Sequence, residues 1–188
     1  MRCGEKEQIA AVLLKLNRKN EYGVRDALVE NIADFLPELV IRKMIATLQK
    51  SADAEENEYR KRDHLMLIER MARQIKDPQL FEQTRIASWG GELSTAAFID
   101  IARVYLESGE VEIAYSWLLK IPENETFQSY ERDKLLQEIY TKQGDDKKLT
   151  ELLYRKFRSS HSSDTLQELL AVIGEDKRDE TISTEIDS

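Results

Sequence analysis

The chain has 188 residues, of which 41% are hydrophobic and 34% are charged, and its formal net charge is −8. It holds only seven glycines and three prolines, too few for the many tight turns of an all-β fold. Because Cys3 is the only cysteine, an intrachain disulfide and a cysteine-rich zinc site are excluded.

The distribution of charge and of apolar residues bears on partners and on location. Residues 1–50, 51–94, 95–174 and 175–188 carry net formal charges of +2, −2, −4 and −4. No segment has the strong basic field that attracts nucleic acid, which argues against that partner. No apolar stretch of signal-peptide length follows the N-terminus, and no run approaches the roughly 18 residues of a spanning helix. We therefore expect a cytoplasmic protein with no membrane partner.

Residues 1–87 predict a front part made of amphipathic helices. Apolar residues at helical spacing indicate two short helices that are separated near Asn20. Pro37 suits the first turn of a third helix, which should end near Ser51. The stretch 54–76 has a continuous helical pattern and predicts the longest helix of the chain. Asp77 and Pro78 then indicate the N-cap and first position of a short helix.

Residues 88–93 contain Gly90 and Gly91, the clearest break in the chain. We expect the boundary between the two parts of the protein here. The neighbouring Trp89 is either an exposed aromatic anchor or a lid that closes the core between the two parts. Because aromatic side chains bury large areas, the lid is the favoured interpretation.

Residues 94–174 predict a more regular back part of helical hairpins. The expected hairpin helices span residues 94–107, 110–120, 129–142 and 145–158. Ser94 is the expected cap of the first, and Gly109 and Gly144 turn the chain within each hairpin. Thr165 and Glu168 have the spacing of a capping box before a closing helix that ends near Gly174. Residues 175–188 contain six acids and two bases and predict a disordered acidic tail.

The two hairpins recur with a spacing of 35 residues, which is typical of helical solenoids. The positions that stand opposite one another are Ile101, Tyr105, Gly109 and Leu118 in the first hairpin and Leu136, Tyr140, Gly144 and Leu153 in the second. Residues 95–158 resemble the tetratricopeptide repeat, through Phe98, Ala102, Tyr105, Gly109, Ala114 and Leu118. The second hairpin departs from this pattern at Asp133, Gln137 and Leu149.

Two further resemblances extend the same expectation to the rest of the chain. Residues 24–28, Val-Arg-Asp-Ala-Leu, precede an apolar helix in a way that resembles HEAT repeats. The runs 117–121 and 169–174, with Tyr105 and residues 135–136, resemble a bacterial helical family that has no assigned activity. We therefore expect an all-α fold of about ten helices, stacked as antiparallel hairpins in an α-α superhelix of the tetratricopeptide or HEAT type.

Candidate chemical groups are few and dispersed along the chain. His64 lies within the long helix and His161 in a serine-rich connection, where surface or capping roles are expected. The pair Asp145-Asp146 follows Gly144 at a helix start, where negative charge favours capping. Acids at helical spacing neutralise the basic run 60–62, which indicates a solvated face. The sequence carries no phosphate loop, nucleophile elbow or zinc-protease motif, so we expect neither an enzyme nor a cofactor.

These patterns predict a non-enzymatic interaction module that presents a concave surface to a protein or peptide partner. The tetratricopeptide-like register implies a partner-binding face made of Ile99, Arg103, Glu107, Lys134, Glu138 and Lys142. Two alternatives remain open. One is a nucleic-acid-binding helical repeat, and the other is an enzyme whose site is assembled only in the fold.

Overall fold

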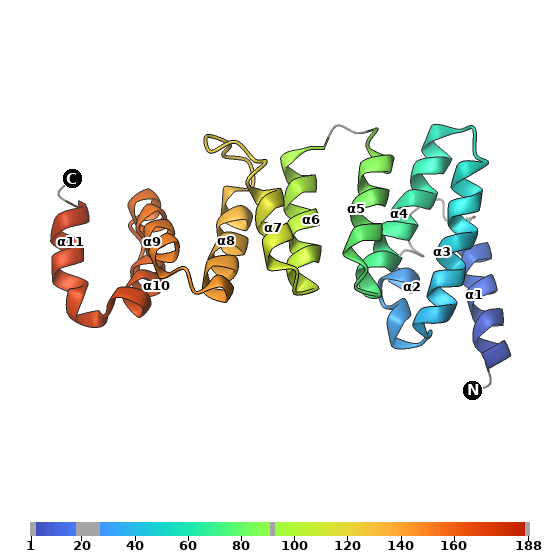
Figure 1. Ribbon diagram of the computed structural model, residues 1–188, viewed down its shortest axis with the longest axis horizontal. Helices are drawn as coiled ribbons and strands as arrows, with labels where there is room; N and C mark the ends of the chain where they lie inside the picture. The colour runs from blue at the N-terminus through green and yellow to red at the C-terminus, as the bar shows by residue number, and fades with distance from the viewer. Residues whose placement is uncertain (1–2, 18–26, 91–92, 187–188) are drawn as a thin grey trace. The chain divides into compact units, whose positions relative to one another are not determined.

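A computed structural model describes residues 3–17, 27–90 and 93–186, and these residues contain helices and no strand. The protein is therefore all-α, as predicted (Figure 1). The α-helices are α1 (Cys3–Asn17), α2 (Ala27–Glu30), α3 (Glu38–Asp53), α4 (Glu58–Gln74), α5 (Pro78–Ser88), α6 (Thr95–Glu107), α7 (Val111–Leu118), α8 (Ser129–Gln143), α9 (Asp146–Ser160), α10 (Ser163–Ile173) and α11 (Arg178–Ile186). Two short 3₁₀ helices, η1 (Ile32–Asp34) and η2 (Glu175–Lys177), complete the described elements.

The chain forms two compact units, Met1–Glu110 and Val111–Ser188. The division therefore falls behind α6, and not at residues 88–93 as the glycine pair predicted. The reason is that α6 packs on α5. The Tyr105 hydroxyl donates a hydrogen bond of 2.5 Å to Glu82, and Arg85 lies 3.4 Å from Asp100. Burial together with this hydrogen bond raises the pKa of Tyr105. The contacts between α5 and α6 therefore place the boundary after α6, although the glycine pair marks a local break in the chain. Gly91 of that pair lies outside the described residues.

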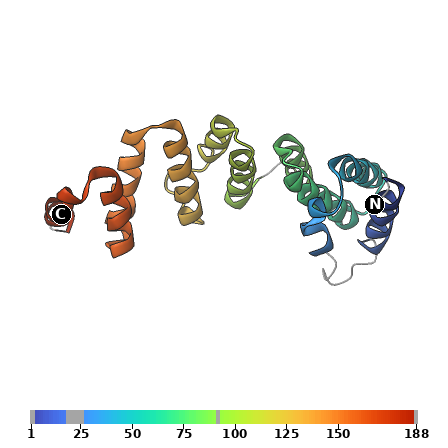
Figure 2. The same ribbon diagram turned by 90° about the horizontal axis from the view of Figure 1, so that it is seen from below.

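The first unit has an apolar core to which α1, α3 and α4 contribute. Its fully buried side chains include Ile41, Ile68 and Met71. The helices α3, α4 and α5 pack in succession, which Figures 1 and 2 show from two sides. The longest described helix is α4, as predicted, but it is shorter than the predicted 54–76. The side chain of Asn57 accepts the N–H of Arg60 and begins the helix there.

Local capping signals place several other helix ends. Asp77 accepts the N–H of Leu80 at 3.1 Å, and Ser94 accepts that of Ala97 at 3.3 Å, as predicted. Pro37 is the N-cap residue of α3, one position before the predicted first turn. The predicted break at Asn20 lies outside the described residues.

The second unit has its own apolar cluster, built from α9 and α10, against which Tyr140 of α8 also packs. Helices α8 and α9 lie side by side in Figures 1 and 2. The helix α10 begins at Ser163, because the side chain of Ser162 accepts the N–H of Thr165. The predicted capping box at Thr165 and Glu168 is therefore wrong, since Ser162 supplies the cap three residues earlier and Glu168 pairs with Lys156 instead.

The predicted disordered tail, 175–188, is also wrong for the residues that the structure describes. Residues 175–177 form η2, and α11 follows. Glu185 of α11 forms a two-oxygen ion pair with Arg158 of α9, in which Arg158 Nη2 lies 2.8 Å from Glu185 Oε1. Thr181 is buried and Ile182 packs against the apolar cluster. Composition alone predicted disorder because these contacts come from a distant helix.

The 35-residue recurrence is visible in the way that two helices end. The N–H of Glu110 donates to the carbonyl of Tyr105 at 2.9 Å, and the N–H of Asp145 donates to that of Tyr140 at 3.0 Å. Gly109 and Gly144 have φ values of 85° and 66°. Both ends are therefore Schellman motifs, which favour glycine at the left-handed position.

The prediction that the whole hairpins are equivalent is not settled by these local motifs. Tyr105 is buried, whereas Tyr140 is only half-buried and meets Tyr115 edge to face. Because α6 belongs to the first unit and α7 to the second, the tetratricopeptide-like arrangement of the first hairpin stays a prediction.

Candidate functional site: an arginine-lined cleft

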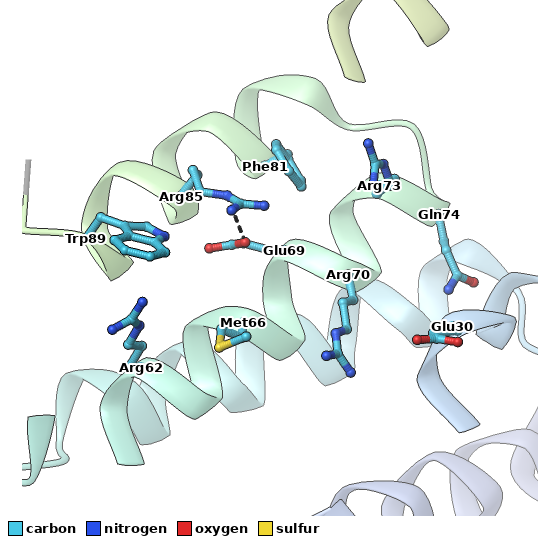
Figure 3. A pocket seen from close by; sticks show the side chains of 10 residues that line it. All are labelled: Glu30, Arg62, Met66, Glu69, Arg70, Arg73, Gln74, Phe81, Arg85 and Trp89. Carbon is cyan, nitrogen blue, oxygen red and sulfur yellow. Dashed lines mark ion pairs between the residues drawn. The ribbon is translucent and has the colours of Figure 1, made fainter. Parts of the chain in front are cut away.

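The first unit contains a cavity of about 440 Å³ between α4 and α5. Four arginines line it, together with two glutamates, one glutamine and three apolar side chains (Figure 3). The lining residues are Glu30, Arg62, Met66, Glu69, Arg70, Arg73, Gln74, Phe81, Arg85 and Trp89. We call this cavity the arginine cleft.

Helical periodicity explains why these side chains share one cavity. On α4, positions 62, 66, 69 or 70, and 73 follow one another at intervals of three or four residues, so they lie on one face. Leu65, Ile68 and Met71, on the other side of α4, are buried in the core and fix its rotation. On the facing helix α5, Phe81, Arg85 and the following Trp89 recur every four residues in the same way.

Glu69 and Arg85 form the centre of the cleft. Arg85 Nε lies 3.0 Å from Glu69 Oε2, and the two side chains are only 18% and 8% exposed. The Ser88 hydroxyl donates a hydrogen bond of 2.7 Å to Glu69. Burial raises the pKa of Glu69, and the hydrogen bond from Ser88 and the charge of Arg85 oppose that rise. The ionised carboxylate is thus held in a site that disfavours its charge.

Trp89 lies at one end of the cleft, where the guanidinium of Arg62 stacks 4.1 Å from its ring centre (Figure 3). This is a cation–π contact between α4 and the end of α5. The tryptophan is 46% exposed, so the prediction that it closes a core between two parts is wrong. Arg62 is itself exposed, which agrees with the solvated face that was predicted for the run 60–62.

Phe81 forms part of the cleft wall and lies between two further cations. The guanidinium carbons of Arg85 and Arg73 are 5.1 Å and 5.6 Å from its ring centre. Arg73 Nε is 3.7 Å from a carboxylate oxygen of Glu107 on α6, too far for a hydrogen bond. Arg73 Nε and Nη2 are buried and make no hydrogen bond, whereas Arg85 Nε is paired with Glu69 by charge and distance without the alignment of a hydrogen bond. Buried donors of this kind are costly unless an acceptor satisfies them.

The six residues of the predicted partner-binding face belong to two different units. Ile99, Arg103 and Glu107 belong to α6 in the first unit, whereas Lys134, Glu138 and Lys142 belong to α8 in the second. Ile99 is 2% exposed, so the prediction that it contacts a partner is wrong; it is a core residue.

The other five predicted residues carry polar groups at the surface. Arg103 is half-buried and lies 3.9 Å from Asp100, and Glu107 is exposed beside Arg73 of the arginine cleft. Lys134 is exposed, and Lys142 lies 3.6 Å from Glu138 one turn away. Glu107 is therefore the residue of this set that lies beside a lining residue of the arginine cleft.

The remaining candidate groups lie outside the cleft. His161 ends α9 as its C-cap, where its ring meets Phe157 edge to face, and His64 is half-buried on α4. Asp145 caps α9 by accepting the N–H of Lys148, as predicted. This bond and a second one from the Lys148 side chain lower the pKa of Asp145. Within the described ranges, no cluster of three or more potential metal ligands occurs, and no helix has the length and apolarity needed to cross a membrane.

Comparisons with protein-family models, with curated proteins and with solved structures gave no match. The arginine cleft therefore rests on its own geometry. Sequence interpretation missed it, although one signal was present: arginines or aromatic residues recur at intervals of three or four residues along both α4 and α5. This spacing predicts a shared cavity only when α4 and α5 are known to face each other.

Proposed function

We propose that the protein is a non-enzymatic helical interaction module, and that its arginine cleft docks an acidic segment of a protein partner. The observation that carries the proposal is the convergence of four guanidinium groups on one cavity in which two buried donors of Arg73, Nε and Nη2, make no hydrogen bond. Carboxylates and other oxyanions are the groups that match a guanidinium fork, because they accept two parallel hydrogen bonds from it.

The composition of the cleft supports a peptide segment as the occupant. Its four cations exceed its two carboxylates, while Met66, Phe81 and Trp89 provide apolar and aromatic surface beside them. Arginine and aromatic residues that lie together in a concave site are typical of the energetically dominant part of protein interfaces. An acidic side chain next to an apolar one would satisfy both kinds of surface.

The cationic surface is local, which favours a protein segment over nucleic acid. The chain as a whole has a formal charge of −8, and binding of a phosphate backbone needs a continuous basic stripe that this balance opposes. The tetratricopeptide-like and HEAT-like interpretations of the sequence point to the same class of function, since such repeats bind segments of other proteins.

Titration with a fluorescein-labelled peptide tests the proposal. The probe is a twelve-residue peptide rich in Asp and Glu with one central Phe, and the full chain is titrated into it at low salt. We expect Arg73→Ala and Arg62→Ala each to weaken binding by at least about tenfold, because each removes a charge-assisted contact worth about 1.5–3 kcal/mol.

Arg60→Ala is the matched control, because Arg60 is an exposed arginine of α4 that does not line the cleft. Its affinity should equal that of the wild type. Equal loss of affinity in all three variants would show that the peptide responds to the overall charge of the protein and not to the cleft. Tight binding of a duplex DNA oligonucleotide, without binding of the acidic peptide, would replace this proposal with the nucleic-acid alternative.

A further inference from the structure

Glu69 occupies the position in the arginine cleft that an incoming anion would take. Its carboxylate projects from α4 toward α5 and pairs with Arg85 at 3.0 Å (Figure 3). Arg85 also meets Asp100 of α6 at 3.4 Å. Arg85 is therefore already paired with two carboxylates. Of these two carboxylates, that of Glu69 lines the cavity.

The charged and polar groups around Glu69 lie on α2, α4, α5 and α6. Arg62 lies on α4 itself, Arg85 and Ser88 lie on α5, and Asp100 lies on α6. Arg70 and Arg73 of α4, and Glu30 of α2, line the same cavity. The cations and Ser88 stabilise the ionised form, whereas burial and the like charge of Asp100 oppose it.

We infer that Glu69 is a built-in competitor of the cleft, so that an anionic group of the partner binds with uptake of one proton by Glu69. The inference rests on the proposed function and adds its regulation. An anion beside Arg85 repels the Glu69 carboxylate, and the low dielectric of the cleft strengthens that repulsion. A proton from solvent removes the repulsion and leaves Arg85 to pair with the anion. Affinity therefore rises as the pH falls through the range in which Glu69 takes up its proton.

The sign of the effect follows from linkage. Glu69 already binds its proton more readily than an exposed glutamate, since burial raises its pKa. A bound anion raises that pKa further, so the complex holds more protons than the free protein between the two values. Binding is strongest below the lower value and weakest above the higher one.

The experiment compares wild type with Glu69→Gln in the full chain. The probe is a labelled peptide with one sulfotyrosine, because its sulfate ester stays ionised across the pH range, and the same peptide with tyrosine is the control. Calorimetric titration in two buffers of different ionisation enthalpy counts the protons. We expect Glu69→Gln to bind about tenfold more tightly at pH 7.5 with no proton uptake, since it keeps the shape of Glu69 and removes the charge.

Ser88→Ala provides a second readout that does not depend on the folding of Glu69→Gln. This variant removes a hydrogen bond that lowers the pKa of Glu69. The pH at which the affinity changes should therefore move upward. Circular dichroism at each pH confirms that the variants keep their helices.

The outcomes separate this inference from the function on which it rests. Sulfopeptide binding by the wild type without proton uptake, and with no gain in Glu69→Gln, would overturn the role of Glu69 and leave the docking function standing. Failure of both proteins to bind the sulfopeptide and the acidic peptide at any pH between 5 and 8 would overturn both.

Discussion

Leu118 and Leu119 are neighbours in sequence, yet one is 3% exposed and the other 64% exposed. Leu118→Ala should lower the free energy of unfolding by about 2–5 kcal/mol, because it leaves a cavity in a packed interior. Leu119→Ala removes the same atoms from a solvated position and should change it by less than about 0.5 kcal/mol. Denaturant unfolding followed by circular dichroism measures both, and equal midpoints would remove Leu118 from the core.

At the scale of single residues, the sequence predicts most where the physics is local. Asp77, Ser94 and Asp145 cap their helices as expected, because a capping side chain meets a backbone N–H three residues away. Thr165 failed as a cap because Ser162 offers the same chemistry one turn earlier. Arg62 was missed because its partner, Trp89, lies on another helix.

At the scale of elements, the helix α11 is joined to α9 by the ion pair of Glu185 with Arg158. Hydrogen bonds from Arg158 lower the pKa of Glu185, whose side chain is 8% exposed. A carboxyl group of this kind stabilises the fold above its unfolded pKa, near 4.5, and the stabilisation is lost as the pH falls through the lower folded value. The acidic composition of residues 175–188 predicted disorder, and the sequence did not show that Arg158 of α9 pairs with Glu185.

Amide hydrogen exchange tests the role of this pair. Glu185→Gln should lower the protection of residues 178–186 at pH 7, because Gln loses the charge that binds Arg158. Wild type should lose the same protection as the pH falls from about 4.5 through the lower folded pKa of Glu185, where its carboxylate becomes protonated. Glu180→Gln is the matched control on the same helix, since Glu180 is exposed and only approaches Lys177 at 3.5 Å. Unchanged exchange in Glu185→Gln would show that apolar packing alone holds α11.

At the scale of the whole molecule, the all-α class follows directly from composition and periodicity, whereas the boundary and the candidate site do not. The glycine pair suggested a division at 88–93, but the contacts of α5 with α6 carry the first unit on to Glu110. The predicted face assumed one register across two hairpins, and because its residues belong to both units, that face stays a prediction. The arginine cleft depends on two helices that meet only in the fold, so the spacing of arginines and aromatic residues along each helix did not by itself predict it.

The most direct test of the docking function is an amide NMR titration of the full chain with the acidic peptide. We predict that shift changes concentrate in α4 and α5, at residues 58–74 and 78–89, because the cations of the cleft lie there. The same titration reports on the alternative face of α8, at Lys134, Glu138 and Lys142. Changes confined to α8, with α4 and α5 undisturbed, would contradict the account.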